Sequence, residues 1–254
     1  MDKIKIIYKK KKVYKPSKLK PNHKHYFDKV RDEVFTRQVV KVDNHNVIFG
    51  VEGPIILSEG KFWSISAEVE NGRWGKHWIM VAPDLPTVLK RKSCFLRIDS
   101  GCLSGVLGDR TCDCIEQLKV SQIEALKKQG VIIYIPKQDG RGYGSEFKMA
   151  NQRIMNDCKM DTIIVAEHFY ENYDKIDIRT FDEAVIILKA IGFPKGYKFN
   201  LGTKNPRKVQ ALLEGGYIIK AHEISIKNKG PFLENNFKAK YKFFEKEKEK
   251  YETY

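Results

Sequence analysis

The pattern of apolar and polar positions changes near residue 114, and it predicts strands before that point and alternating helices and strands after it. Residues 61–69 alternate strictly between apolar and polar side chains, which predicts a half-buried strand of an antiparallel pair. Short apolar runs at 78–82 and 94–98 predict two further strands. The first half of the chain therefore contributes several short strands.

Helices and buried strands alternate in the second half. A helix is expected over residues 115–130, ending at Gly130, and another over about 145–157. The continuous apolar runs at 131–135 and 162–166 predict buried strands. The pattern as a whole predicts one α+β or mixed α/β domain, with a mixed sheet whose N-terminal strands are antiparallel.

Two more helices have recognisable first residues. Thr180 and Glu183 have the spacing of a capping box, and apolar residues recur behind them at helical spacing. Asn205 followed by Pro206 is typical of an N-cap and a first helical residue. We predict a basic N-terminal arm, a catalytic domain and a charged C-terminal tail, at residues 1–40, 41–228 and 229–254.

Most of the positive charge lies in the two end segments. The 254 residues have a formal net charge of +15, of which the first 24 contribute +9 and the segment from Lys227 onward +3. The run Lys9–Lys12 is typical of a nucleic-acid or localisation patch, and equally of a frayed basic arm. The alternating charges of KEKEKYETY favour a solvated tail compatible with a helix.

Composition excludes several classes of protein. Apolar residues at 42% and aromatic residues at 11% exclude a disordered or collagen-like chain. No stretch approaches the ~18 consecutive apolar residues of a membrane span, and the basic start lacks the apolar run of a signal peptide. We therefore expect a cytoplasmic protein without membrane contacts. Its five cysteines then favour metal binding, catalysis or packing over disulfides.

Cys102, Cys112 and Cys114 form the first chemical signal. Three thiolates with one open position are the typical ligand set of catalytic zinc, and a Cys-x-Cys pair just before a helix brings both sulfurs to one side. Three buried cysteines that pack as small apolar groups are the alternative. Cys94 and Cys158 lie within apolar patterns, so we expect both in the core.

Three further segments have the residues of an anion site. The glycine-rich loop at 137–144 lets backbone approach a ligand closely, although an ordinary turn has the same composition. The segment 203–208 places three cations at a helix N-terminus, where phosphate binds readily. Asp177 and Arg179 are two residues apart on an extended segment and can face one site, or form a surface ion pair.

Together these motifs resemble GTP cyclohydrolase II, a zinc enzyme of riboflavin synthesis, over about two thirds of the chain from residue 77 to about 240. The resemblance rests on their order, which is RIDSGCLSG, CDC, EQL, QDGRGYG, DT, DIRTF and TKNPRKV. It implies the family's fold, a homodimer, one Zn²⁺ per chain, and Mg²⁺ accompanying the triphosphate. The implied substrate is GTP or a related purine nucleotide, opened at its imidazole ring with release of formate and pyrophosphate.

The resemblance also implies roles for individual residues. Asp177 matches the family's proposed proton acceptor, and Arg179 matches its proposed nucleophile toward the α-phosphate. Charge stabilisation suits arginine better, because its pKa exceeds about 12. The implied zinc ligands are Cys102, Cys112 and Cys114. The implied GTP-binding residues are Arg97, Gln117, Asp139, Gly140, Arg141, Thr162, Thr203 and Lys208.

Several positions depart from the family pattern. Asp99-Ser100-Gly101 replaces His-Ser-Glu, and NQRIMN replaces AYALQD, so that Gln152 stands in place of a tyrosine. Three hypotheses follow. The chain is a GTP cyclohydrolase II, a divergent relative acting on another nucleotide (for example a uracil-catabolism-type relative), or a zinc-stabilised nucleotide- or RNA-binding protein without turnover.

Overall fold

The described chain divides into two compact units, residues 1–36 and 37–254. The computed structural model describes residues 18, 20–35, 37–109, 112–169, 176–226 and 231–250. In the first unit the described residues form one helix, α1 (Pro21–Phe35). The run Lys9–Lys12 lies outside the described residues, so the nucleic-acid or localisation patch considered for it stays a prediction.

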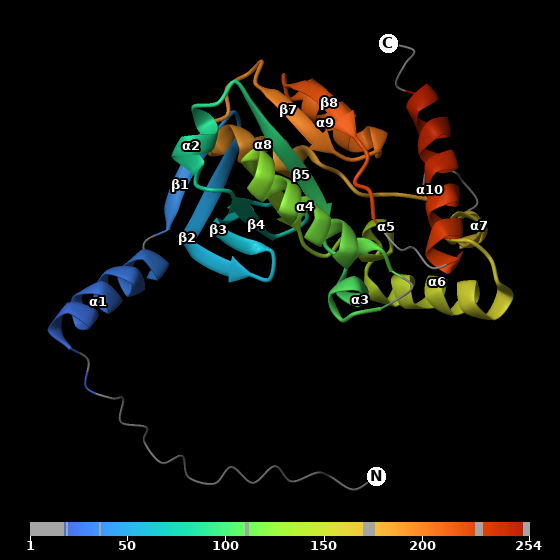
Figure 1. Cartoon of the computed structure of the whole chain (residues 1–254), viewed down its shortest axis with the longest axis horizontal. Coiled ribbons are helices and arrows are strands. Elements are labelled where there is room, and N and C mark those ends of the chain that lie inside the picture. Colours follow the sequence, from blue (N-terminus) through green and yellow to red (C-terminus); the bar gives the residue numbers. More distant parts are fainter. Residues whose placement is uncertain are drawn as a thin grey trace, which may run out of the picture. The chain divides into compact units, whose positions relative to one another are not determined.

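A mixed sheet forms the centre of the second unit (Figure 1). Its strands follow the order β1-β2-β3-β4-β6-β5-β7-β8. Neighbours from β1 to β4, and β4 with β6, are antiparallel, whereas β6, β5, β7 and β8 are parallel. The predicted mixed sheet with antiparallel N-terminal strands is therefore confirmed. The bounds are β1 Gln38–Val42, β2 His45–Leu57, β3 Gly60–Val69, β4 Lys76–Val81, β5 Ser93–Ser100, β6 Gly130–Ile135, β7 Lys198–Gly202 and β8 Ile218–His222.

Helices cover both faces of this sheet. On one face α4 packs over β3, β5 and β6, and on the other α8 packs over β1, β2 and β3 and also contacts α9. The helices α6, α7 and α10 lie beyond the carboxyl end of β5 (Figure 1). The bounds are α2 Leu85–Leu89, α3 Leu103–Val106, α4 Cys114–Lys128, α5 Asp139–Gly142, α6 Ser145–Cys158, α7 Thr162–Phe169, α8 Asp182–Ala190, α9 Pro206–Glu214 and α10 Pro231–Glu249.

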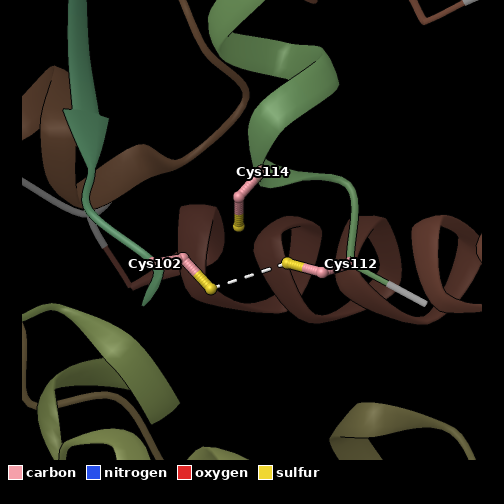
Figure 2. A group of neighbouring side chains, drawn as sticks. All are labelled: Cys102, Cys112 and Cys114. Carbon is pink, nitrogen blue, oxygen red and sulfur yellow. Dashed lines mark hydrogen bonds between the residues drawn. The ribbon is translucent and has the colours of Figure 1, made fainter. Parts of the chain in front are cut away.

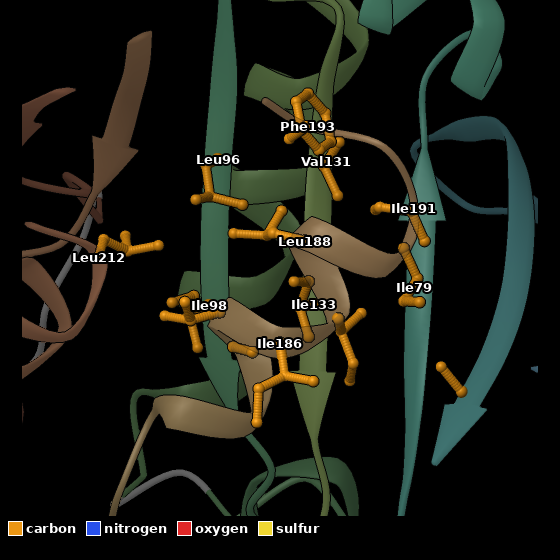
Figure 3. Close-up of a cluster of buried hydrophobic side chains, with 14 of the residues drawn as sticks. Ile79, Leu96, Ile98, Val131, Ile133, Ile186, Leu188, Ile191, Phe193 and Leu212 are labelled. Atoms are coloured by element: carbon orange, nitrogen blue, oxygen red, sulfur yellow. The ribbon is translucent and has the colours of Figure 1, made fainter. Parts of the chain in front are cut away.

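Successive side chains of the central strands point to opposite faces of the sheet, and each face therefore has an apolar core. Leu96 and Ile98 of β5 belong to the larger cluster, where they meet Leu188 of α8, whereas Phe95 belongs to the cluster that faces α4 (Figure 3). The side chains of Phe95 and Leu96 have no exposed surface. Because both faces are covered, these strands read as continuous apolar runs in the sequence.

The strand predicted at 162–166 is wrong, because these residues belong to helix α7. The Asp161 carboxylate accepts hydrogen bonds from the backbone N–H of Ile163 at 2.8 Å and of Ile164 at 3.0 Å, as an N-cap does. Ile163 also packs with Phe243 of α10 in a separate apolar cluster. Capping and tertiary packing therefore outweigh the β-propensity of this branched run.

The capping box predicted at Thr180 and Glu183 is also wrong, although the helix exists. Helix α8 begins at Asp182 after Phe181. The Thr180 hydroxyl instead accepts a hydrogen bond from the Trp74 indole at 3.2 Å, and the Glu183 carboxylate accepts one from the Trp74 backbone N–H at 3.1 Å. Both side chains thus connect α8 to the turn before β4.

The helix predicted to end at Gly130 ends two residues earlier. Gln129 takes the left-handed conformation after α4, with φ of 54°. Gly130 already belongs to β6, where a Cβ atom would lie 2.5 Å from the carbonyl oxygen of Phe95. This glycine therefore permits close pairing of β5 with β6, and it does not end the helix.

The charged tail predicted at residues 229–254 contains, in its described part, helix α10, which packs on the rest of the unit. Phe243 and Glu247 are each 2% exposed, and α10 packs against α7 and α9. Of KEKEKYETY the described residues are 246–250. Helix α10 extends to Glu249, as the pattern allowed, and these residues are exposed except for Glu247. Across the described ranges, no helix combines the length and apolar character needed to span a bilayer.

Candidate active site

The site forms at the carboxyl ends of the parallel strands. Ser100, the last residue of β5, pairs with Ile135, the last residue of β6, so the loops that follow both strands leave from one edge. β7 lies on the opposite side of β5, and the chain after it leads into α9. Ligands of open parallel sheets bind at this kind of edge, where successive connections diverge.

The three predicted metal ligands converge (Figure 2). Cys102 follows β5, whereas Cys112 and Cys114 lie at the start of α4. All three sulfur atoms lie within 4.8 Å of one another, with 3.5 Å between Cys102 Sγ and Cys112 Sγ, and none forms a disulfide. Thiolates bound to zinc at about 2.3 Å in a tetrahedral arrangement lie at similar separations. The donors therefore fit a thiolate-binding metal such as zinc and not a hard oxygen-seeking ion.

The cysteines outside the triad behave differently from one another. Cys94 is buried, as predicted, and burial raises the pKa of its thiol to about 12. Cys158 at the end of α6 is exposed, so the core position predicted for it is wrong. Within the triad, hydrogen bonds from Cys112 and Cys114 lower the pKa of Cys102 and favour its thiolate.

A first cavity of about 130 Å³ lies beside the triad and is rich in cations. The Arg97 guanidinium donates to Gln117 Oε1 at 2.8 Å and to Asp99 Oδ2 at 3.1 Å, which holds it in place. Lys208, at the start of α9, donates to the carbonyl oxygen of Ile98 at 2.8 Å. The predicted binding residues that line this cavity are Arg97, Gln117, Thr203 and Lys208, together with Arg179.

The helix start beside this cavity is built as predicted. Asn205 Oδ1 accepts a hydrogen bond from the Arg207 backbone N–H at 3.0 Å, and Pro206 is the first residue of α9. The Thr203 hydroxyl accepts from the Asn205 N–H at 3.0 Å. Lys204 next to them pairs with Glu223 at 2.9 Å. The positive end of α9 therefore faces a cavity that already contains several cations.

A second cavity of about 110 Å³ adjoins the first, since Ser100, Cys114, Arg179, Lys240 and Phe244 line both. The glycine-rich loop forms part of its wall as the short turn α5, in which Gly140 and Arg141 take left-handed conformations with φ of 55° and 61°. The predicted binding residues found here are Asp139, Gly140, Arg141 and Thr162, with Cys102 and Cys114 of the triad.

Charged groups of the second cavity are held in fixed positions. Asp139 Oδ1 accepts a hydrogen bond from the Leu103 backbone N–H at 2.6 Å, and burial raises the pKa of this carboxyl. Burial lowers the pKa of Arg141 to about 10, which leaves it protonated at neutral pH. Its guanidinium lies 5.5 Å from the ring centre of Phe243 on α10.

Asp177 and Arg179 form an ion pair, which is buried and not on the surface as the alternative interpretation of their spacing had it. Arg179 donates from Nε to Asp177 Oδ1 at 2.9 Å and from Nη2 to Oδ2 at 2.5 Å. Burial alone raises the pKa of Asp177, but the charge and hydrogen bonds of Arg179 outweigh this effect and lower the pKa to about 2. Arg179 lines both cavities, whereas Asp177 lies behind it and lines neither.

Helix α10 contributes residues that no sequence motif indicated. Lys240 pairs with Asp113 at 2.8 Å, between the second and third cysteines, and Glu247 pairs with Arg207 at 2.7 Å. Arg207 also donates to the carbonyl oxygen of Asp177. These contacts are separated by up to 127 residues in the sequence, so local pattern gave no signal for them.

Two departures from the family pattern have structural explanations. A Cβ atom at Gly101 would lie 2.6 Å from the Ile135 carbonyl oxygen and 2.9 Å from the Tyr134 ring, so no larger residue fits between β5 and Cys102. Gln152, in place of the family tyrosine, donates its amide N–H to the Asp109 carboxylate. It therefore points toward the loop that carries the cysteines.

The metal site has a direct test. We expect the purified protein to bind about one zinc ion per chain and Cys112→Ser to lose most of it, because a three-sulfur site cannot replace a missing thiolate. Zinc content measured by mass spectrometry checks this, with Cys158→Ser as the matched control because that thiol is exposed. Retention of wild-type zinc content by Cys112→Ser would contradict the assignment.

Acid unfolding tests the ion pair. Because the pKa of Asp177 falls from its ordinary 3.8 to about 2, the pair stabilises the fold above pH 4 and loses this contribution as pH falls toward 2. The contribution of the pair to the free energy of unfolding is about 2 kcal/mol, of which about 1 kcal/mol is lost by pH 3. Urea denaturation between pH 5 and pH 3 should show this extra loss in the wild type but not in Asp177→Asn. An equal loss of unfolding free energy in wild type and in Asp177→Asn over this pH range would contradict the stabilising role of the pair.

Comparison with known proteins agrees with the geometry. A model of the GTP cyclohydrolase II family matches residues 62–223. The chain is similar to GTP cyclohydrolase-2 of Vibrio parahaemolyticus (36% identical over 122 residues, 48% of this chain and 58% of that protein) and of Campylobacter hominis (33% over 149 residues, 58% and 68%). It is also similar to the riboflavin biosynthesis protein RibBA of Staphylococcus saprophyticus (33% over 135 residues, 52% and 32%). The matches thus span 58% to 68% of the two GTP cyclohydrolase-2 relatives. Since the family match covers more than half of the chain, the chain belongs to the GTP cyclohydrolase II family.

Proposed function

We propose that this protein is a zinc-dependent hydrolase that opens the imidazole ring of GTP. The products are formate, pyrophosphate and a diaminopyrimidine ribosylamine phosphate, as in the first step of riboflavin synthesis. One observation carries the proposal: in a chain of this family, a convergent cysteine triad adjoins a cavity lined by Arg97, Arg179 and Lys208. A thiolate metal site beside a cation-lined cavity suits hydrolysis of a nucleoside triphosphate.

The reaction consumes three water molecules. One cleaves the bond between the α- and β-phosphates and releases pyrophosphate. A second adds to C8 of guanine and opens the five-membered ring to a formamide, and a third releases formate from that amide. A zinc ion held by Cys102, Cys112 and Cys114 would supply the Lewis acidity that makes water nucleophilic at neutral pH.

The protein's own residues would hold the triphosphate in the first cavity. Arg97, Lys204 and Lys208 offer cations there, and the start of α9 offers its positive end. We propose that Mg²⁺ arrives with the triphosphate and shields its charge. Preformed positive charge of this kind binds the ground state and also stabilises charge that develops on the phosphate oxygens.

We assign Arg179 to charge stabilisation and Asp177 to the positioning of Arg179. Although burial disfavours its charged form, the pairing with Asp177 raises the pKa of Arg179, so its guanidinium is no nucleophile at neutral pH. A carboxyl with a pKa of about 2 that lines neither cavity is a weak proton acceptor. Its bidentate contact with Arg179 instead aims the guanidinium at the cavities.

A second candidate is a divergent enzyme of the family acting on another nucleotide. The observation that favours it is Gln152, which stands where the family has a tyrosine and is hydrogen-bonded to the Asp109 carboxylate. A tyrosine can donate a proton in catalysis and an amide cannot, so this change alters the chemistry near the cysteines.

We also propose, from the family, a homodimer located in the cytoplasm.

Product analysis tests the proposal. Zinc-loaded protein with GTP and Mg²⁺ should release formate and pyrophosphate, and Arg179→Met should lower formate release by about 100-fold, as the loss of a charge-stabilising group does. Lys246→Met is the matched control, because Lys246 is an exposed cation of α10 that lines neither cavity.

Other outcomes separate the hypotheses. Turnover of another purine nucleotide but not of GTP would favour the divergent enzyme. Binding of nucleotide or RNA without any turnover would overturn both catalytic proposals and favour the binding protein.

A further inference from the structure

Polar atoms without partners gather at the second cavity. Among the described residues, Ser100 Oγ, Gln138 Oε1 and Asn151 Oδ1 have no hydrogen-bond partner, although Gln138 is 3% exposed and Asn151 is 5% exposed. All three residues line this cavity, together with Cys102 and Cys114. A buried acceptor without a donor costs free energy, so such atoms in a cavity indicate where a ligand supplies donors.

The two amide side chains come from different elements beside the cavity. Gln138 follows β6 and donates from Nε2 to the Thr180 carbonyl oxygen at 3.4 Å, which leaves Oε1 as its unused group. Asn151 lies in the middle of α6, where it and Met155 are the buried side chains of the helix.

The chemistry of the two oxygens selects the ligand. Each accepts hydrogen bonds, so the group that fills this part of the cavity must present N–H or O–H donors. Guanine has two adjacent donors on one edge, the N1–H and the 2-amino group. Adenine has only its amino group beside a ring acceptor, and hypoxanthine lacks the 2-amino donor. Two acceptors therefore favour guanine over both.

We propose that Asn151 is a specificity-determining residue that accepts a hydrogen bond from the 2-amino group of a guanine base, with Gln138 accepting a second bond on the same edge. This inference rests on the proposed function, because it takes the second cavity as the place of the base. Asn151 stands where the family pattern AYALQD has alanine, so the contact is a property of this chain. The adjacent first cavity, with its cations, then takes the phosphates.

Binding of two nucleotides that differ by one amino group tests this role. The probes are the α,β-methylene analogues of GTP and of inosine triphosphate, and calorimetry on the zinc-loaded protein gives both dissociation constants. We expect wild type to prefer the guanosine analogue about tenfold, the usual value of one hydrogen bond. Asn151→Leu, which keeps the branched shape and the number of side-chain heavy atoms, and Asn151→Ala should both reduce this ratio to about one.

The matched control is Asn156→Ala, since Asn156 is an exposed asparagine of the same helix, and it should keep the wild-type ratio. A merely structural role of Asn151 would weaken both analogues equally and leave the ratio unchanged, which would overturn the proposal. Equal binding of both analogues by wild type, or binding of neither, would overturn it as well.

Formate release measured in parallel separates this inference from the proposed function. Wild type that binds the guanosine analogue with the expected preference but releases no formate from GTP would refute the enzymatic proposal and support the role of Asn151. If formate is released from GTP but both Asn151 variants keep the wild-type preference, the enzymatic proposal is supported and the role of Asn151 is refuted.

Discussion

Positive charge is buried at one edge of the sheet, and the groups around it are arranged to compensate it. Arg97, Arg179 and Lys208 line a cavity at the ends of the parallel strands, where burial disfavours the charged forms of Arg179 and Lys208 and lowers the pKa of Lys208 well below its ordinary value. Each has a specific acceptor: Asp99, Asp177 and a backbone carbonyl oxygen. Removing an acceptor leaves a buried charge unpaired, so the cation cluster and its partners must form together.

Helix α10 completes this arrangement from the far end of the chain. Its Glu247 pairs with Arg207, which in turn contacts the backbone of Asp177, and its Lys240 pairs with Asp113 beside the cysteines. The site thus combines the strand ends of the matched family region with a helix that follows that region. Loss of α10 would expose the cavities and leave charges on both sides unpaired.

Local physical signals account for what the sequence predicted. Strict alternation located β3, and the Asn205 cap located α9, because both depend on neighbouring residues alone. The spacing of the cysteines indicated a shared site but left packing as small apolar groups open, and the family resemblance favoured the shared site that the sulfur positions now support. The strand prediction at 162–166 was wrong because the Asp161 cap and packing against α10 outweigh the β-propensity of these residues. The packing of α10 depends on contacts between residues far apart in the sequence, which no local pattern contains. For the same reason the sequence did not indicate that the Asn151 side-chain oxygen is buried beside the cavity.

In the function that we propose, the two adjoining cavities divide one nucleotide between them. A crystal structure of the zinc-loaded protein with a non-hydrolysable GTP analogue tests this most directly. We expect phosphates within hydrogen-bonding distance of Arg97 and Lys208, and the guanine ring in the second cavity between the cysteine triad and Asn151. A nucleotide bound outside these cavities, or one with its phosphates in the second, would contradict it.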